Sequence, residues 1–396
     1  MAGSWEGVLK TPSGGQLRLR VHVEKTAGGA WKAALDSPDQ GAFGIAADSA
    51  SFDGGVLRWS IQKLRATYEG RLSADDSALE GTFTQGVAMP LVLKRMAAGT
   101  SRAPGRPQMP KAPFPYRATE VSFPSVEAGV TLAGTLTLPA AAGPHPAVIL
   151  ISGSGPQDRD ESIMGHKPFL VLADWLTRRG IAVLRYDDRG VGKSTGSFAG
   201  ATSVGFSNDA EGALNYMSGR ADIDRKRIGF LGHSEGGLIA PMVAVRRAEV
   251  AFLVLLAGTA VPGAEILLAQ GEAIGKAAGA PEGALAQNRA LQEKFFITYD
   301  PAPVLRRVKT PVLALFGEKD LQVLPDQNAP ALEAALRDAR NEHVKIHRLA
   351  GLNHLFQPAK TGSPQEYAEI EQTMDEGALK LIGEWVSRTA GLEAGQ

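Results

Sequence analysis

The sequence contains no cysteine, which excludes disulfides, thiolate nucleophiles and cysteine-ligated zinc or iron–sulfur centres. It also lacks an excess of charge, because 42 lysines and arginines balance 42 aspartates and glutamates. Nothing therefore indicates nucleic acid or an anionic membrane surface as a partner. Long apolar runs are missing too, since the longest, Val250 to Ala257, is far shorter than the ~20 residues of a membrane span.

The first ten residues, MAGSWEGVLK, show no basic segment followed by an apolar one. We therefore expect no signal peptide in the chain as written. This expectation fits a cytoplasmic protein and equally an exported protein in its processed form. The absence of cysteine does not separate the two compartments.

A proline-rich segment divides the chain, whose 396 residues exceed the length of one ordinary domain. Between Met96 and Tyr116 lie five prolines and no apolar periodicity, which is typical of a linker. The predicted organisation is a first domain over residues 1–97, a linker over 98–116 and a second domain over 117–396.

The first domain has the patterning of antiparallel strands. Apolar residues alternate with polar ones from Leu17 to Glu24, which places one face in a core and the other in water. Similar short runs follow at 56–61, 66–72 and 79–84, separated by turn sequences such as Asp53-Gly54-Gly55. We predict a small antiparallel β-barrel or sandwich, similar to a lipocalin, that serves as an accessory rather than as an independent binding module.

The second domain alternates strand-length apolar runs with helical segments. The runs occur at 147–151, 181–184, 228–231, 252–256 and 312–316, and helical periodicity occurs between them, for example at 166–179 and 208–219. Continuous apolar strands that alternate with helices predict an α/β domain, with a mostly parallel sheet covered on both faces.

Residues 227–237, RIGFLGHSEGG, read as a buried strand, a tight turn and the start of a helix predicted over 238–246. The turn holds the pattern G-x-S-x-G, with Ser234 at its centre. A nucleophilic serine must stand on a sharp turn, and the flanking glycines let strand and helix approach each other without a clash. The pattern alone is weak and can be an incidental glycine-rich turn, but in this strand–helix context it predicts Ser234 as a nucleophile.

This segment resembles the nucleophile elbow of the α/β-hydrolase superfamily. Four further motifs occur in the order of a bacterial carboxylesterase group within that superfamily: ISGSGPQDRDE at 151–161, RYDDRGVGKSTG at 185–196, FGEKDLQV at 316–323 and GLNHLFQ at 351–357. The resemblance covers residues 117–396 and implies the α/β-hydrolase fold and a serine carboxylesterase. The β-rich segment in front is similar to an accessory domain found in some members.

In this superfamily the acid and then the histidine follow the serine along the chain. His354 lies in a loop beyond the last strand-like segment, where a catalytic base would be presented. His343 and His347 belong to that strand-like segment, and their spacing of four would suit a metal only on a helix. We therefore predict His354 as the general base and no metal site.

The acid is expected after the strand at 311–316. Asp320 lies in the following loop, where the acid of the family belongs, and Glu318 and Asp326 are the alternatives. The carboxylate would fix the tautomer of the histidine and stabilise its protonated form.

An oxyanion hole requires two backbone N–H groups aimed at one point. One is expected from Glu235, the residue after the nucleophile, and the resemblance implies Ser154 as the other, with Gly155 as a near alternative. The small-residue loop at 152–155 shows neither a P-loop nor the G-x-G-x-x-G pattern. No nucleotide, metal or organic cofactor is therefore expected.

Two more segments are expected to surround the site. The polar, glycine-rich loop that begins with Asp188-Arg189 favours an Asp–Arg hydrogen-bonded brace for the oxyanion segment, to which residues 157–159 would contribute. Residues 259–300 are expected to form a short, mostly helical cap, with helices at 265–278 and 282–296.

The predicted function is hydrolysis of small carboxylic esters, with short- to medium-chain acyl groups, through an acyl-enzyme. The same residues would serve a thioesterase, an amidase or a peptidase. Peptidases of this superfamily commonly carry a β-propeller in front, for which about 97 residues are too few. A non-catalytic protein that binds ligands through its β-domain is the alternative from another class. The sequence does not indicate the oligomeric state.

Overall fold

The computed structural model describes residues 1–11, 15–40, 42–97, 105–279 and 299–392. These residues form two compact units. The first contains Met1–Gly105 with the short segments Ile163–Gly165 and Tyr367–Glu371, and the second contains Arg106–Ser162, His166–Glu366 and Gln372–Gln396. Most of the predicted linker's first half, residues 98–104, lies outside the described residues.

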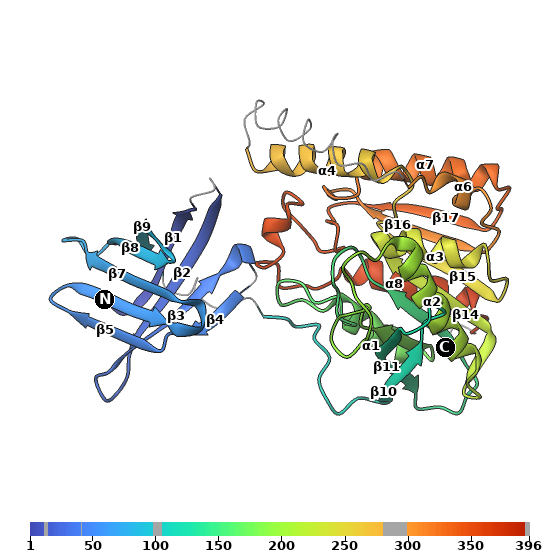
Figure 1. The fold of residues 1–396 in the computed structure, drawn as a ribbon, viewed down its shortest axis with the longest axis horizontal. Coiled ribbons are helices and arrows are strands. Elements are labelled where there is room, and N and C mark those ends of the chain that lie inside the picture. Colours follow the sequence, from blue (N-terminus) through green and yellow to red (C-terminus); the bar gives the residue numbers. More distant parts are fainter. Residues whose placement is uncertain (12–14, 41, 98–104, 280–298, 393–396) are drawn as a thin grey trace. The chain divides into compact units, whose positions relative to one another are not determined.

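The first unit is built on one antiparallel sheet of nine strands, in the order β4-β3-β2-β1-β9-β8-β7-β6-β5 (Figure 1). Its strands are β1 (Gly3–Lys10), β2 (Gln16–Lys25), β3 (Trp31–Ser37), β4 (Ala42–Ala46), β5 (Ser49–Asp53), β6 (Val56–Ile61), β7 (Ala66–Leu72), β8 (Ala78–Gln85) and β9 (Val87–Arg95). The predicted small antiparallel β-domain is therefore confirmed, and it is a half-barrel made of one sheet rather than a two-sheet sandwich.

Side chains on alternate positions of these strands point to the same face of the sheet and form a hydrophobic core there. Trp59 of β6 stacks on Tyr68 of β7, with ring centroids 5.8 Å apart, and tilts against Phe83 of β8 at 6.0 Å. Register pairs Trp59 with Tyr68 and Tyr68 with Phe83, so the three rings form a row on one face. Cross-strand aromatic pairs of this kind stabilise a sheet beyond their burial alone.

The second unit contains an eight-stranded sheet in the order β10-β11-β13-β12-β14-β15-β16-β17. Its strands are β10 (Tyr116–Pro124), β11 (Thr131–Pro139), β12 (His145–Ile151), β13 (Ala182–Tyr186), β14 (Ile223–His233), β15 (Val250–Leu256), β16 (Val312–Gly317) and β17 (Val344–Leu349). The first two strands pair antiparallel, and all pairs from β13 to β17 are parallel. This confirms the predicted α/β domain with a mostly parallel sheet.

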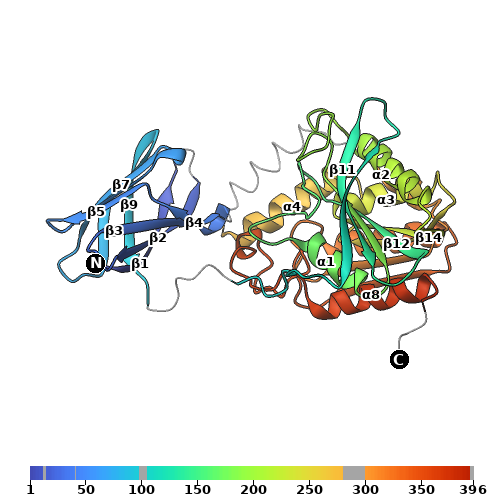
Figure 2. The same cartoon turned by 90° about the horizontal axis from the view of Figure 1, so that it is seen from below.

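Helices cover both faces of this sheet. They are α1 (Pro168–Thr177), α2 (Ser203–Ser218), α3 (Glu235–Ala244), α4 (Gly263–Ala277), α6 (Ala302–Leu305), α7 (Pro325–Asp338) and α8 (Glu376–Thr389). Helices α1 and α8 contact each other on one face, and α2 and α3 pack together on the other (Figure 2). No described helix has the length and apolar character needed to cross a bilayer.

Several predicted boundaries need correction. Helix α2 begins at Ser203, five residues before the predicted start, and α3 begins at Glu235 rather than Leu238. Both predictions rested on apolar periodicity, which does not extend into the first turns of these helices, SVGF in α2 and EGGL in α3. In the predicted cap, α4 matches the first helix, whereas the second, at 282–296, lies outside the described residues.

Candidate active site

Ser234 occupies the sharp turn between strand β14 and helix α3. Its backbone has φ 53° and ψ −115°, a conformation that costs free energy for a residue with a side chain. The Ser234 N–H donates to the carbonyl of Leu256, 2.8 Å away at the end of β15. The neighbouring strand therefore holds the turn in place, and the serine side chain is half-buried rather than enclosed.

The glycines around Ser234 are required by contact. A Cβ on Gly232 would lie 2.0 Å from the carbonyl oxygen of Gly236, and a Cβ on Gly236 would lie 2.1 Å from that of Ile151. A Cβ on Gly237 would meet the Cα of Gly258 at 2.6 Å. Strand, turn and helix can thus approach this closely only without side chains at these positions.

Asp320 and His354 lie together in the loops that follow β16 and β17. Asp320 Oδ2 is 2.8 Å from His354 Nδ1, and both side chains are buried. The other carboxylate oxygen, Oδ1, accepts the backbone N–H groups of Gln322 at 2.8 Å and Val323 at 2.9 Å. The carboxylate is therefore fixed, and its Oδ2 directs the Nδ1 proton of the imidazole.

The alternative residues lie elsewhere. Glu318 is exposed, and Asp326 forms a surface ion pair with Arg348 at 2.7 Å. His347 lies within strand β17, and His343 is an exposed residue directly before it. The structure brings none of these four into contact with the Asp320–His354 pair.

The loop after β12 passes directly beside the serine. A Cβ on Gly153 would lie 3.2 Å from the Cβ of Ser234. The N–H of Gly153 donates to Glu161 at 2.8 Å, so it is already used. In the described part of the chain, the N–H groups of Ser154 and Glu235 donate no hydrogen bond.

Buried polar contacts brace this loop. Asp188 accepts the Ser152 hydroxyl and the Gln157 N–H, each at 3.0 Å, and Arg159 forms two charged hydrogen bonds with Asp187. Burial opposes ionisation, yet the Arg159 guanidinium and its N–H lower the pKa of Asp187. The predicted brace therefore exists, with the acidic residue 187 paired to residue 159.

One part of the predicted brace is wrong, because Asp188 and Arg189 do not pair with each other. Arg189 instead forms a bidentate pair with Asp209 of α2, at 2.7 and 2.8 Å, and an additional bond to Glu127. Asp188 therefore faces the oxyanion loop while Arg189 faces α2.

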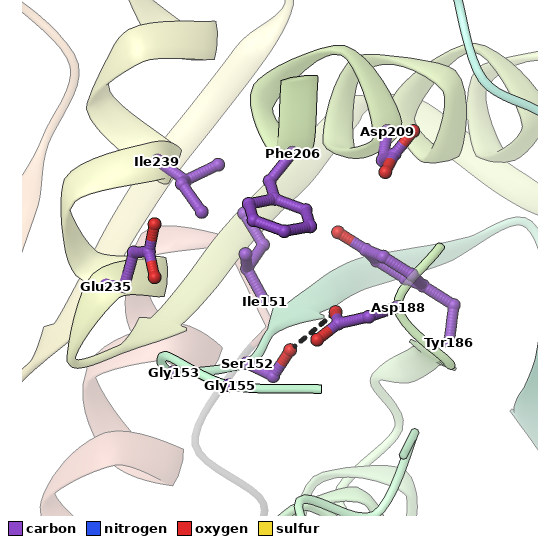
Figure 3. Close-up of a pocket in the computed structure, with 10 residues that line it drawn as sticks. All are labelled: Ile151, Ser152, Gly153, Gly155, Tyr186, Asp188, Phe206, Asp209, Glu235 and Ile239. Atoms are coloured by element: carbon purple, nitrogen blue, oxygen red, sulfur yellow. Dashed lines mark hydrogen bonds between the residues drawn. The ribbon is translucent and has the colours of Figure 1, made fainter. Parts of the chain in front are cut away.

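A small cavity with polar and apolar walls lies behind the oxyanion loop (Figure 3). Its volume is about 10 Å³, at most the space of a single water molecule. Burial raises the pKa of the Asp188 carboxyl in its wall to about 7. The cavity is too small for an acyl chain. It is lined by Ile151, Ser152, Gly153, Gly155, Tyr186, Asp188, Phe206, Asp209, Glu235 and Ile239.

The sequence analysis assigned no role to two buried residues of the site, Glu161 and His233. His233 Nδ1 lies 2.8 Å from Glu161, and its Nε2 lies 3.0 Å from the carbonyl oxygen of His354. Both residues belong to motifs that the sequence analysis identified. The sequence of these motifs did not indicate that two residues 72 positions apart would form a hydrogen bond.

The strand order and the serine turn after β14 define the class of the second unit, which has the α/β-hydrolase fold. An esterase of Pyrococcus furiosus superposes with a TM-score of 0.50 at 20% identity, over 73% of this chain and 99% of its own. The α/β hydrolase GrgF from Penicillium sp. sh18 also gives 0.50, at 18% identity, over 69% and 99%. The model of the prolyl oligopeptidase family matches residues 169–376, which is 208 of 396 residues. The chain belongs to this family.

Among curated proteins, Esterase EstD of Thermotoga maritima is 30% identical over 276 residues. The match covers 64% of this chain and 65% of the relative, just under two thirds of its length.

Proposed function

We propose that the protein is a serine hydrolase that cleaves small carboxylic esters through an acyl-enzyme, with Ser234 as nucleophile, His354 as general base and Asp320 as the residue that orients it. Asp320 holds the proton on Nδ1 of His354, which leaves Nε2 to take the serine proton. The similarity to Esterase EstD supports ester bonds as the target.

In the proposed reaction, Ser234 Oγ attacks the ester carbonyl while His354 takes its proton. The N–H groups of Ser154 and Glu235 stabilise the oxyanion of the tetrahedral intermediate. His354 then gives the proton to the leaving alcohol, and the acyl group stays on the serine. Water, activated by His354, attacks this ester and releases the acid.

The observation that carries the proposal is the strained backbone of Ser234. A φ of 53° on a serine costs folding free energy on the order of 1–3 kcal/mol, and such strain is concentrated at functional sites. It presents the hydroxyl at the N-terminus of α3, where helical N–H groups favour negative charge.

The family also favours a second candidate, hydrolysis of peptide or other amide bonds. The same residues would perform it, as they would thioester cleavage, because only the leaving group differs. The first unit, a single nine-stranded sheet, is not a β-propeller. We therefore place esters first, with the β-domain as an accessory.

The test is to measure initial rates on p-nitrophenyl acetate, butyrate and octanoate with the intact protein and with Ser234→Ala. We expect turnover of the short esters that falls by about 10⁵-fold or more in the variant. Ser4→Ala, a serine in strand β1, is the matched control and should retain full activity. Turnover that survives in Ser234→Ala would contradict the proposed nucleophile. An inactive but folded parent protein would direct the search to peptide substrates.

A further inference from the structure

A buried carboxylate, Glu161, lies on a strained turn directly behind the oxyanion loop. Its side chain is buried, and its φ is 53°, in the left-handed region that non-glycine residues rarely adopt. Asp158 fixes this turn, because its carbonyl accepts the N–H of Glu161 at 2.9 Å and its carboxylate accepts two further backbone N–H groups. The turn therefore holds Glu161 pointing inward at a cost in free energy.

The partners of Glu161 and His233 come from the three segments that carry the proposed catalytic groups. Glu161 Oε1 accepts the N–H of Gly153 in the oxyanion loop at 2.8 Å. The same oxygen lies 2.8 Å from His233 Nδ1, directly before the nucleophile. His233 Nε2 lies 3.0 Å from the carbonyl oxygen of His354. One hydrogen-bonded chain thus joins the oxyanion loop, the nucleophile strand and the base loop.

The chemistry of these partners fixes the number of protons. His233 lies between a carboxylate oxygen and a carbonyl oxygen, and neither is a donor when Glu161 is ionised. Two protons are needed for the two hydrogen bonds. Burial opposes charge on the imidazole, but the Glu161 carboxylate outweighs this and raises the pKa of His233. The two hydrogen bonds of His233 together therefore require an imidazolium paired with a carboxylate.

Such a pair can hold geometry without disturbing the charge of the site. The rings of His233 and His354 are 4.7 Å apart between centroids, so a lone cation at His233 would oppose protonation of His354 during the reaction. Paired with Glu161, it adds no net charge. Charged hydrogen bonds are about twice as strong as neutral ones. The hydrogen bonds of the Glu161–His233 pair should therefore hold the three segments firmly together.

We propose that Glu161 and His233 are positioning residues that hold the oxyanion loop and the main chain of His354 in fixed places relative to Ser234. This inference rests on the proposed function. The Glu161–His233 pair acts on Gly153, whose Cα faces Ser234, and on the backbone of His354, but it is assigned no contact with substrate. It should therefore affect the chemical step and leave substrate binding almost unchanged.

The sharpest variant is Glu161→Gln. The amide oxygen can replace Oε1 as acceptor for Gly153 and His233, but the negative charge is lost. Without it His233 becomes neutral and has only one N–H. Whichever way the amide is turned, one of the three hydrogen bonds that join Gly153, residue 161, His233 and His354 must then break. His233→Gln is the second variant: its amide can reach toward the His354 carbonyl but has lost the charged bond to Glu161.

The experiment measures the rate at which a fluorophosphonate probe labels Ser234, together with kcat and KM on p-nitrophenyl butyrate and the melting temperature. Labelling requires the nucleophile, the base and the oxyanion hole: Oγ bonds to phosphorus, fluoride leaves, and the proton passes to His354. A small misplacement of reacting groups can cost about 100-fold in rate. We expect both variants to lose about 10- to 100-fold in labelling rate and in kcat, with KM within about twofold.

Asp36→Asn is the matched control. Asp36 is a buried carboxylate in the β-domain that bonds His22 at 2.7 Å and the N–H of Gly44 at 2.6 Å, so the chemical change is the same outside the hydrolase unit. It should leave labelling and kcat unchanged. Glu161→Gln labelled at the parental rate would overturn the inference, even if its melting temperature fell. A parent protein that is not labelled at all would contradict the proposed function instead.

Discussion

Each of the two units contains a histidine hydrogen-bonded to an aspartate, and the serines assigned to the two sets differ in their backbone surroundings. In the β-domain, Ser4 Oγ lies 2.9 Å from His22 Nδ1, and His22 Nε2 lies 2.7 Å from Asp36. Ser4 and His22 are cross-strand partners in the regular β1–β2 ladder. In the hydrolase unit, the corresponding residues stand on loops at the ends of parallel strands.

The difference lies in the backbone rather than in the side chains. Ser234 stands on a strained turn at the start of a helix, near the N–H groups of Ser154 and Glu235, which donate no hydrogen bond within the described residues. Ser4 lies within a regular strand, and no helix follows it. Three residue types within hydrogen-bond distance do not define a nucleophile, because activation also requires a place for the developing charge.

The largest effect that tests this comparison is expected for Asp320→Asn. Since Oδ1 of Asp320 accepts two backbone N–H groups, the amide oxygen of asparagine should take that place and turn its NH₂ toward His354 Nδ1. The imidazole proton would then move to Nε2, where a base is needed. We expect kcat on p-nitrophenyl butyrate to fall by about 10⁴-fold.

The counterpart is Asp36→Asn, with the same substitution in the β-domain. It should leave kcat unchanged, because the Ser4–His22 contact has no catalytic role. A comparable loss in both variants would mean that the β-domain network takes part in catalysis, and the comparison would fail.

The next effect concerns ion pairs in the two units. Asp209→Ala removes the bidentate partner of buried Arg189 and leaves the half-exposed Glu127 as its remaining ionic partner. Removing one partner of a buried ion pair typically destabilises by about 3–5 kcal/mol, and Glu127 should keep the loss at the lower end of this range. Glu69→Ala in the β-domain removes a bidentate pair with Arg58 of the same form, but both side chains are more than half exposed. An exposed pair contributes about 0.2–1 kcal/mol.

Urea unfolding of each variant, followed by circular dichroism, measures both effects. The transition of the hydrolase unit should move to lower urea in Asp209→Ala, while Glu69→Ala should barely shift any transition. Equal shifts would show that burial does not decide the strength of these pairs.

The two units also differ in how far their sequences predicted them. The alternation of apolar and polar residues at 56–61 and 66–72 predicted strands β6 and β7 with the bounds that the structure shows. A strand with one buried face has this two-residue period in its sequence. Strands β3, β4, β5 and β9 were not predicted. The short strands β4 and β5 are rich in alanine, serine and glycine and carry little apolar contrast, whereas β9 has a proline at position 90 within its apolar run. Parallel strands such as β16 were found because they are buried on both faces.

In the site, the residues on motif turns were predictable and their supports were not. Ser234, Asp320 and His354 each follow a recognisable strand, so chain order brought them to one edge of the sheet. The contact of Arg189 with Asp209 and that of Glu161 with His233 depend on which way a side chain points and on long-range packing. Sequence spacing carries no information on either.

The last prediction concerns the pH dependence of stability from Asp188, whose hydrogen bonds come from the neutral donors Ser152 and Gln157 rather than from an imidazole as at Asp36. Burial raises the pKa of Asp188 to about 7, above its ordinary value of about 4. The folded state therefore favours the protonated acid. Its contribution is complete below about pH 4 and is lost as the pH rises through about 7.

Asp188→Asn removes this titration while keeping both hydrogen bonds, because the Ser152 hydroxyl can turn to accept from the new amide. Between about pH 4 and 7 the parent should lose stability that the variant retains, so the two unfolding free energies should diverge across this range and keep a constant difference above it. All other titrating groups are common to both proteins, and the difference between the two curves isolates Asp188. Parallel curves would mean that Asp188 ionises at its ordinary pKa and that the cavity behind the oxyanion loop solvates it as well as water does.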